Sequence, residues 1–273
     1  NTINGNVYAN SAGWLSGGIY LNSSSSNIIS ANVYNNHGND SGGGIYLNSS
    51  SSNIISGNVY SNFATNGGGI YLYNSGHNLI SGNVFYNTAA TNGGGIYLSL
   101  SSYNTISSNV YGNFARYGGG ICLVNSTSNI ISGNTYSNKA QNDGGGIYLG
   151  SSSFNTISGS VYSNMVNLGF GGGIDIISTK SNILSGDVYG NYAIWGGGVS
   201  LRYSTNNILS NNIFNNWAGL AGGGVFLKES LDTDFTHVKI FSNTAQYGGG
   251  IQVEKTTNET ITGIIYGNKA NRR

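Results

Sequence analysis

Carboxylates are the side chains of this sequence that could act as acid–base catalysts or hold a calcium ion. The chain contains nine, namely Asp40, Asp143, Asp175, Asp187, Glu229, Asp232, Asp234, Glu254 and Glu259. A paired-carboxylate site needs two or three acids side by side, and Asp234 and Glu259 form the single pair at matching positions of successive repeats. Segment 228–239 also contains two lysines and His237. It is either a calcium or sugar site or a solvated, irregular loop.

Other residues that could carry chemistry are few. His37 and His77 fall in expected turns without partners, Cys122 is the one cysteine, and no Ser/His/Asp or Cys/His arrangement stands out. The glycine triplets lack the lysine and the helix that follow a phosphate-binding loop. The sequence therefore predicts a protein that is not an enzyme and that uses no cofactor and no metal ion.

Composition narrows the range of partners. Charged residues make up 7% of the chain and the formal net charge is +1, so nothing would attract nucleic acid. The apolar runs are only a few residues long, and we expect no membrane insertion by this segment. The chain also contains Asn-x-Ser/Thr sequons, whose glycosylation stays open, at Asn22, Asn39, Asn48, Asn125 and Asn258.

A repeat of 25–27 residues runs through the whole chain. Its marker, the Ile or Val after a glycine-rich run, occurs at Ile19, Ile45, Ile70, Ile96, Ile121, Ile147, Ile174, Val199, Val225 and Ile251. Three short stretches of each repeat have strand character, and the frequent glycines and Asn-Ser turns exclude helices. Stacked coils bury a core that no single coil can bury, and parallel crossovers are right-handed. The repeat predicts an all-β fold, a right-handed parallel β-helix (solenoid) of about ten coils with three short strands each, in a single domain over residues 1–273.

Columns of matching residues define the expected inside of the solenoid. Alternate residues of each strand, such as Val59 and Ile70, form apolar columns that should face inward. An asparagine recurs between the second strand and the glycine run, and its amide can donate and accept along the stack. We expect a structural ladder of Asn36, Asn62, Asn87, Asn113 and Asn138.

Two aromatic columns are expected on the outside. The first follows the inward Val of the second strand and includes Tyr34, Tyr60, Tyr111 and Tyr136. The second follows the marker Ile and includes Tyr46, Tyr71 and Tyr97. Stacked aromatic pairs stabilise a sheet, and a long exposed aromatic stripe is also a candidate surface for glycans or another protein rod. Both interpretations stay open.

One coil departs from the regular spacing. Eight residues separate the inward Leu from the next first-strand Ile in nearly every coil, but nine separate Leu227 from Thr236. This places Thr236 in an Ile slot and Val238 in a glycine slot. Elsewhere the length varies between the Asn36-type column and the glycine run, which predicts a variable loop at that edge.

The unit Val59-x-x-Asn62-x-Ala64 followed by Gly67, Gly68, Gly69 and Ile70 resembles the FxxN and GGA[I/L/V] repeats of polymorphic outer-membrane proteins and related adhesins. The chain also resembles the pectate-lyase-like superfamily of right-handed parallel β-helix proteins. Val stands where the first family has Phe, and a third Gly stands where it commonly has Ala. The resemblance covers the whole chain and implies an extracellular or cell-surface stalk, which is often part of a larger protein.

These features predict an extracellular structural or adhesive β-helix. A polysaccharide-binding or polysaccharide-degrading protein is the main alternative, and an ice-binding solenoid is a third. No capping helix, charged blocking strand or proline marks either end of the sequence, so we expect either self-association, by end-to-end or lateral stacking into a filament, or a fragment of a larger assembly. Lys269, Arg272 and Arg273 would then need acidic or carbonyl partners. Glycans or other surface proteins are further candidate partners.

Overall fold

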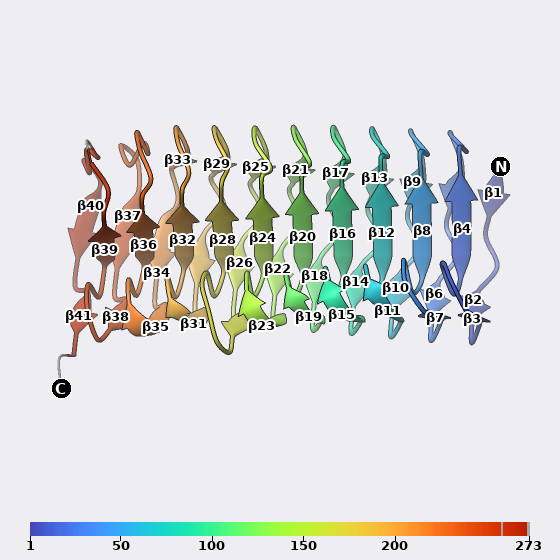
Figure 1. Cartoon of the computed structure of the whole chain (residues 1–273), viewed down its shortest axis with the longest axis horizontal. Coiled ribbons are helices and arrows are strands. Elements are labelled where there is room, and N and C mark those ends of the chain that lie inside the picture. The colour runs from blue at the N-terminus through green and yellow to red at the C-terminus, as the bar shows by residue number, and fades with distance from the viewer. Residues whose placement is uncertain (258, 272–273) are drawn as a thin grey trace.

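The described part of the chain consists of short β-strands that stack into a long rod (Figure 1). The computed structural model describes residues 1–257 and 259–271. In these residues each coil adds one strand to each of up to four parallel sheets, which we name A to D and which contain 9, 11, 11 and 10 strands. The sequon at Asn258 and the cations Arg272 and Arg273 lie outside the described residues.

Sheets A and B follow each other along every coil. Sheet A contains β1 (Thr2–Ile3), β5 (Ile28–Ile29), β9 (Ile54–Ile55), β13 (Leu79–Ile80), β17 (Thr105–Ile106), β21 (Ile130–Ile131), β25 (Thr156–Ile157), β29 (Ile183–Leu184) and β33 (Ile208–Leu209). Sheet B contains β2 (Val7–Tyr8), β6 (Val33–Tyr34), β10 (Val59–Tyr60), β14 (Val84–Phe85), β18 (Val110–Tyr111), β22 (Thr135–Tyr136), β26 (Val161–Tyr162), β30 (Val188–Tyr189), β34 (Asn212–Phe214), β37 (Lys239–Phe241) and β40 (Ile264–Tyr266).

Sheets C and D complete the coil. Sheet C contains β3 (Ser11–Ala12), β7 (His37–Gly38), β11 (Phe63–Asn66), β15 (Thr88–Asn92), β19 (Phe114–Tyr117), β23 (Lys139–Asp143), β27 (Met165–Val166), β31 (Tyr192–Trp195), β35 (Trp217–Ala221), β38 (Thr244–Ala245) and β41 (Lys269–Ala270). Sheet D contains β4 (Ile19–Asn22), β8 (Ile45–Asn48), β12 (Ile70–Tyr73), β16 (Ile96–Ser99), β20 (Ile121–Val124), β24 (Ile147–Gly150), β28 (Ile174–Ile177), β32 (Val199–Arg202), β36 (Val225–Lys228) and β39 (Ile251–Glu254).

The register of the strands confirms the predicted parallel β-helix. Like residues pair with like in successive coils: Val59 pairs with Val84 in sheet B, and Ile70 pairs with Ile96 in sheet D. Because the pairing is parallel throughout, each column of the sequence repeat becomes a row of side chains along the rod. No helix long and apolar enough to cross a membrane occurs among the described residues.

A fourth strand per coil, sheet C, was not predicted. It forms where the sequence indicated a variable loop, and β11 pairs there with β15, with a register shift between Ala64 and Asn66. Ala64 is buried and the backbone N–H of Phe63 donates to Asn36 O at 2.9 Å. The strands of sheet C alternate small buried residues with exposed residues over only a few positions. An alternation of this length does not identify a strand in the sequence. The register shift shows how this edge accommodates coils of different length.

The apolar core lies between sheets A, B and D. It is formed by the inward columns that include Ile55, Val59, Ile70 and Leu72, all fully buried. Sheet C lies outside this core, and three of its residues, Ala140, Val166 and Ala193, form a small buried row of their own. The inward faces predicted from the period-two spacing are therefore confirmed.

Asparagine ladders run inside the turns. The Asn62 amide nitrogen donates to Asn87 Oδ1 at 3.0 Å and to Val33 O at 2.9 Å, and Asn62 N also donates to Asn87 Oδ1. The same pattern links Asn36, Asn62, Asn87, Asn113 and Asn138, none of which is more than 1% exposed. A second ladder, which includes Asn53 and Asn78, runs through the turn from sheet D to sheet A. The amides of Asn36, Asn62, Asn87, Asn113 and Asn138 are thus hydrogen-bonded within the protein.

A serine ladder accompanies the second asparagine ladder. Ser75 Oγ donates to Tyr73 O at 2.8 Å and accepts from Ser50 N at 2.9 Å. The matching serines Ser50, Ser101, Ser126, Ser152, Ser204 and Ser230 are likewise buried. This ladder was missed because its members stand among other serines that face solvent.

The glycine run has two separate structural requirements. Gly67 adopts φ +59°, a left-handed conformation that a side chain would strain. A Cβ on Gly68 would lie 2.4 Å from Thr88 O of the next coil. In the turn from sheet C to sheet D, the backbones of neighbouring coils therefore lie too close together for any residue except glycine.

The irregular coil differs from the prediction. Phe235, not Thr236, fills the core slot above Leu209 and is fully buried, while Thr236 and His237 are exposed in a turn. Leu209 N donates to Asp234 O at 2.9 Å, which fixes this register. The extra residue therefore lies between Phe235 and Val238, after the core slot. Val238 is buried at the former glycine slot, as predicted.

Candidate functional site

The first aromatic column forms a continuous ladder along sheet B. Neighbouring rings, such as those of Tyr34 and Tyr60 or of Tyr111 and Tyr136, have centroids 4.8–5.1 Å apart and planes within 11° of parallel. These separations are typical of offset-stacked aromatic pairs. Because each inner ring is flanked on both sides by other rings, much of its face is covered. The ladder stabilises the sheet first and offers solvent mainly ring edges and hydroxyls.

The chemistry of this ladder is that of ordinary phenols. Partial burial and the neighbouring tyrosines raise the pKa of Tyr111 and of Tyr136. The hydroxyls are therefore protonated at neutral pH and can donate hydrogen bonds. The ladder can hold a neutral partner through these groups, but it has no charge with which to hold an ion.

The second aromatic column is largely covered, which corrects the expectation of an exposed stripe. Tyr46 and Tyr97 are 7% and 8% exposed, and Tyr71 is half-buried. Burial raises the pKa of Tyr46 and of Tyr97 to about 12, and that of Tyr71 still further. The rings point away from the core but lie beside sheet C, whose existence was not foreseen. Tyr46, Tyr71 and Tyr97 are therefore poor candidates for direct contact with a partner.

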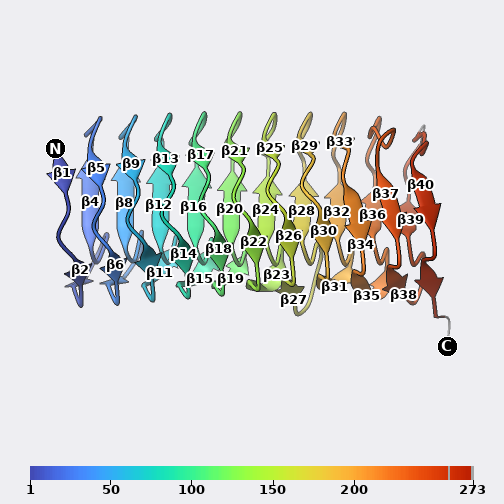
Figure 2. The same cartoon turned by 180° about the vertical axis from the view of Figure 1, so that it is seen from behind.

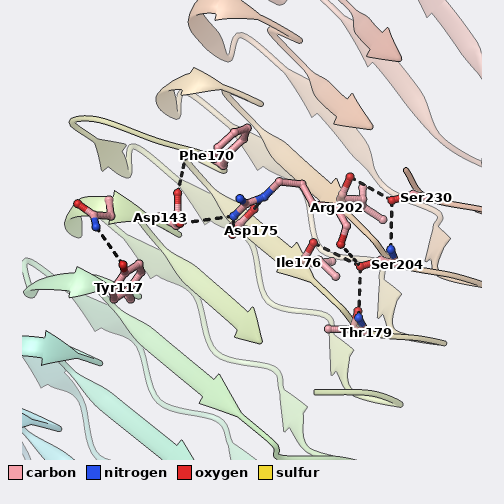
Figure 3. Close-up of polar contacts among 11 residues, drawn as sticks. Tyr117, Asp143, Phe170, Asp175, Ile176, Thr179, Arg202, Ser204 and Ser230 are labelled. Atoms are coloured by element: carbon pink, nitrogen blue, oxygen red, sulfur yellow. Dashed lines mark hydrogen bonds and ion pairs between the residues drawn. The ribbon is translucent and has the colours of Figure 1, made fainter. Parts of the chain in front are cut away.

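Where the second column loses its tyrosines, a charged cluster takes their place (Figure 3). Asp175 in β28 follows Tyr148 in the column and is fully buried. Arg202 in β32 donates to Asp175 from Nε at 3.3 Å and from an Nη at 2.5 Å, and it lies 3.4 Å from Asp143 at the end of β23. A bidentate arginine–carboxylate pair of this kind fixes the geometry of both partners.

The same cluster stabilises the longest connection from sheet C to sheet D, which joins β27 to β28. Phe170 N donates to Asp143 Oδ1 at 2.9 Å, and the Arg202 guanidinium carbon lies 3.9 Å from the centre of the Phe170 ring. The Phe170 ring also stacks on Trp195, with centroids 4.8 Å apart. The backbone hydrogen bond, the ion pair and the stacked rings thus hold residues 166–171 against the neighbouring coils.

Burial raises the pKa of Asp175 to about 6; the Arg202 charge opposes this shift and the nearby Asp143 charge adds to it. A carboxyl with a raised pKa is a feature of many active sites. Here the carboxyl has no exposed surface, and neither of the two hollows described below reaches it. The cluster is therefore arranged to hold structure rather than to transfer protons to a substrate.

Sequence reasoning missed this cluster, although part of its signal was present. Asp175 replaces an aromatic residue in an outward column, and Arg202 stands two residues beyond the matching position of the next coil. Residues so placed are diagonal neighbours on one face of a parallel sheet. Asp143 could not be added, because it belongs to the unpredicted sheet C.

The acidic segment 228–239 does not gather its carboxylates around one point. Glu259 accepts hydrogen bonds from Thr233 N and Oγ1 at 2.9 and 3.0 Å, whereas Asp234 accepts from Thr236. Among the described residues no group of three or more His, Cys, Asp or Glu is placed to hold a metal ion. The segment has the contacts of a self-capped loop.

The histidines have ring partners that the sequence did not reveal. His37, in β7, lies 4.9 Å from the Phe63 ring, and His77 stacks on Tyr103 at 5.2 Å. The two histidines are on different edges of the coil and do not converge with each other.

Sheet C carries a column of varied outward residues. One column contains His37, Phe63, Thr88, Phe114, Lys139, Met165, Tyr192, Trp217, Thr244 and Lys269 in register. The last position of the sheet D strands varies as well, for example from Tyr73 to Ile177 and Lys228, whereas the aromatic column of sheet B repeats one residue type. In repeat proteins, variation on a constant scaffold collects on the binding face.

Two hollows lie along sheet C, and each contains a tryptophan. The first, about 290 Å³, is lined by Gly13, Trp14, Asn39 and Asp40, and Trp14 is 86% exposed. The second, about 310 Å³, is lined by Trp217, Gly219, Ala245, Gln246 and Asn271. Both combine an aromatic face, a glycine that leaves room beside it and a side-chain amide. Such a hollow has the size of a small ligand site.

Comparisons with known proteins divide the chain into two overlapping parts. Residues 1–116 match the family described as periplasmic copper-binding protein (NosD), and residues 108–269 match the family described as right handed beta helix region. No curated protein and no solved structure matches the chain. The second match spans more than half of the sequence and agrees with the parallel coils of the structure. The chain therefore belongs to the right-handed β-helix family.

Proposed function

We propose that this β-helix is a structural and adhesive protein that acts outside the cytoplasm and binds its ligand along sheet C. The observation that carries the proposal is the hollow at Trp14, where an exposed indole stands beside Asn39 and Asp40. The periplasmic description of the family that matches residues 1–116 supports a place outside the cytoplasm. A rod with varied outward residues along sheet C suits adhesion, because the ladders inside the rod hold those residues in fixed positions.

The ligand class that fits the Trp14 hollow best is a glycan. The indole offers a flat apolar face to a sugar ring, and the amide and the carboxylate offer hydrogen bonds to hydroxyls. The aromatic ladder of Tyr34, Tyr60, Tyr111 and Tyr136 is a weaker glycan candidate, because stacking covers much of each ring face. Degradation of the glycan is not part of the proposal, since the buried Asp175 and the dispersed acids of 228–239 cannot reach a substrate together.

Copper binding, which the description of one matching family names, does not fit this chain. Residues 1–116 contain His37 and His77 but no cysteine and no methionine, and copper sites use imidazole, thiolate and thioether ligands. Each of the two histidines stacks on an aromatic ring at a different edge of the coil. Cys122 is fully buried, and burial strongly raises the pKa of its thiol. We therefore derive no copper-dependent role.

The test measures binding of the labelled chain to a panel of immobilised neutral and acidic oligosaccharides. We expect at least one class to bind, and Trp14→Ala to weaken that binding at least about tenfold by removing the stacking face. Tyr203→Ala is the control for a lost surface aromatic ring, because Tyr203 is 48% exposed and lines neither hollow. No binding to any oligosaccharide, or an equal loss in both variants, would show that the Trp14 hollow is not the adhesive site.

End-to-end stacking of copies into filaments is a second proposal and an alternative to lateral pairing of the rods. Sedimentation of the isolated chain tests it, because stacked rods would form an open series of species that grows with concentration. A single monomeric species at high concentration would exclude it.

A further inference from the structure

Sheets A and B lie next to each other along the rod and meet at a bend at Ala31, Gly57 and their equivalents, and their outward residues together form the A/B face (Figure 2). Residues 28–34 alternate strictly between exposed or half-exposed and buried, so Ile28, Ser30, Asn32 and Tyr34 all point outward. The matching residues of successive coils continue each of these four columns along the rod. The face therefore consists of an aliphatic, a serine, an asparagine and an aromatic column.

The aliphatic column exposes large apolar side chains to solvent in several coils. Its isoleucines Ile28, Ile54, Ile130, Ile183 and Ile208 are 41%, 38%, 46%, 38% and 37% exposed. Leu79, Thr105 and Thr156 complete the column between them. Contiguous exposed apolar surface of this kind marks a place of contact with another molecule.

The face carries almost no charge. From residues 2–8 to residues 208–214, Asp187 is the one charged residue in these columns. Its carboxylate accepts a hydrogen bond from the Asn212 side-chain amide at 2.9 Å. A charged partner would gain little here, whereas two such neutral faces would not repel each other.

The dimensions of the face match those of a protein–protein interface. Seven residues at about 3.3 Å each, across about nine coils at about 4.8 Å, cover at most roughly 1,000 Å². A stable interface buries about 800 Å² on each partner. The whole face, but not a single column, is large enough.

From these observations we propose that the A/B face is a lateral docking surface for a second copy of this chain. A second copy is the partner whose columns are certain to repeat with the same coil spacing, so contacts made in one coil recur in the next. Because the same face serves both partners, the interface is isologous and closes as a dimer. The proposal is independent of ligand binding at sheet C, which lies on another part of the coil.

The test is sedimentation velocity of the full chain over a wide concentration range. We expect a monomer–dimer equilibrium with no larger species. Ile130→Lys combined with Ile183→Lys places two charges in the face and should raise the dimer dissociation constant at least about tenfold, or abolish the dimer. The matched control is Phe114→Lys combined with Met165→Lys on sheet C, where the side chains are 38% and 39% exposed. The control should dimerise as the unmodified chain does, and circular dichroism melts should show that both variants fold.

Three outcomes would overturn the proposal. The unmodified chain could remain a monomer throughout, or both double variants could lose the dimer equally. Alternatively, the chain could form an open series that persists in the face variant, which would assign association to the ends of the rod. If the monomeric chain instead binds the oligosaccharide panel and the face variant loses that binding, the face belongs to a glycan. None of these outcomes changes the result expected for Trp14→Ala.

Discussion

At the scale of single residues, the cluster of Asp143, Asp175 and Arg202 has the largest expected energetic consequences. Asp175 is fully buried, and burial raises its pKa from 3.8 to about 6. The folded protein therefore holds a proton that the unfolded chain releases above about pH 4. This group stabilises the fold at low pH, and its contribution is lost as the pH rises through the raised pKa of Asp175.

Arg202→Met tests how the cluster is stabilised. Above the pKa of Asp175 the variant leaves a buried carboxylate without a cation, which costs about 3–5 kcal/mol of unfolding free energy. At about pH 5 the loss should be much smaller, because a protonated carboxyl needs no counter-charge. Denaturant unfolding at about pH 5 and about pH 8 measures both values.

Asp175→Asn in the Arg202→Met background is the control. The amide is isosteric and uncharged, so most of the stability lost at about pH 8 should return. Equal losses for Arg202→Met at both pH values would mean that the charge of Asp175 is not what Arg202 compensates.

At the scale of elements, the asparagine ladders hold successive coils in register. Asn113 donates to Asn138 Oδ1 at 3.0 Å and to Val84 O at 3.0 Å, and its own Oδ1 accepts from Asn87 N and Nδ2. Every one of these groups is buried, so a gap in the ladder leaves donors and acceptors unpaired on both sides.

We expect Asn113→Ala to lower the free energy of unfolding by about 3–5 kcal/mol, since each unpaired buried polar group costs about 1–3 kcal/mol. The control is Asn134→Ala on the outside of sheet B. Asn134 is exposed and its side chain accepts one hydrogen bond, from Ser160 N at 3.0 Å, and water can replace that bond at a cost below about 1 kcal/mol. Similar losses in chemical denaturation for the two variants would refute the structural role of the ladder.

At the scale of the whole molecule, the rod is stabilised by contacts between neighbouring coils rather than by a central site. Each strand pairs with the strands before and after it, and stability in such an arrangement is approximately a sum over neighbouring coils. At the irregular coil Glu259 accepts hydrogen bonds from Thr233, and Asp234 accepts from Thr236.

We expect EDTA to leave the melting temperature unchanged within error and added calcium to leave it unchanged as well. A ligand that binds the folded state raises that temperature, so a calcium-dependent rise of several degrees would contradict this expectation. Loss of such a rise in Asp232→Asn with Asp234→Asn would assign the ion to the 228–239 loop. In the same samples, incubation with neutral and acidic polysaccharides should release no new reducing ends.

Spacing along the sequence was sufficient to predict the coil, its inward columns and the asparagine ladders. A repeated residue such as Ile70, Val59 or Asn62 has the same environment in every coil, so its column position alone defines its role. The physical reason is that parallel stacking converts sequence period directly into spatial neighbourhood.

Tertiary structure decided the features that depend on how the coil folds back on itself. Tyr46 and Tyr97 alternate outward but are nevertheless buried, because each stacks on Tyr71 and lies against the glycine turn of its own coil. The insertion in the irregular coil lies after Phe235 because filling the core slot with a large apolar side chain is favoured over burying Thr236. The contact of Asp143 with Arg202 joins sheets C and D across a turn. Periodicity relates each residue to its equivalents in neighbouring coils, whereas these contacts join residues at different positions of the repeat, and only packing brings such residues together.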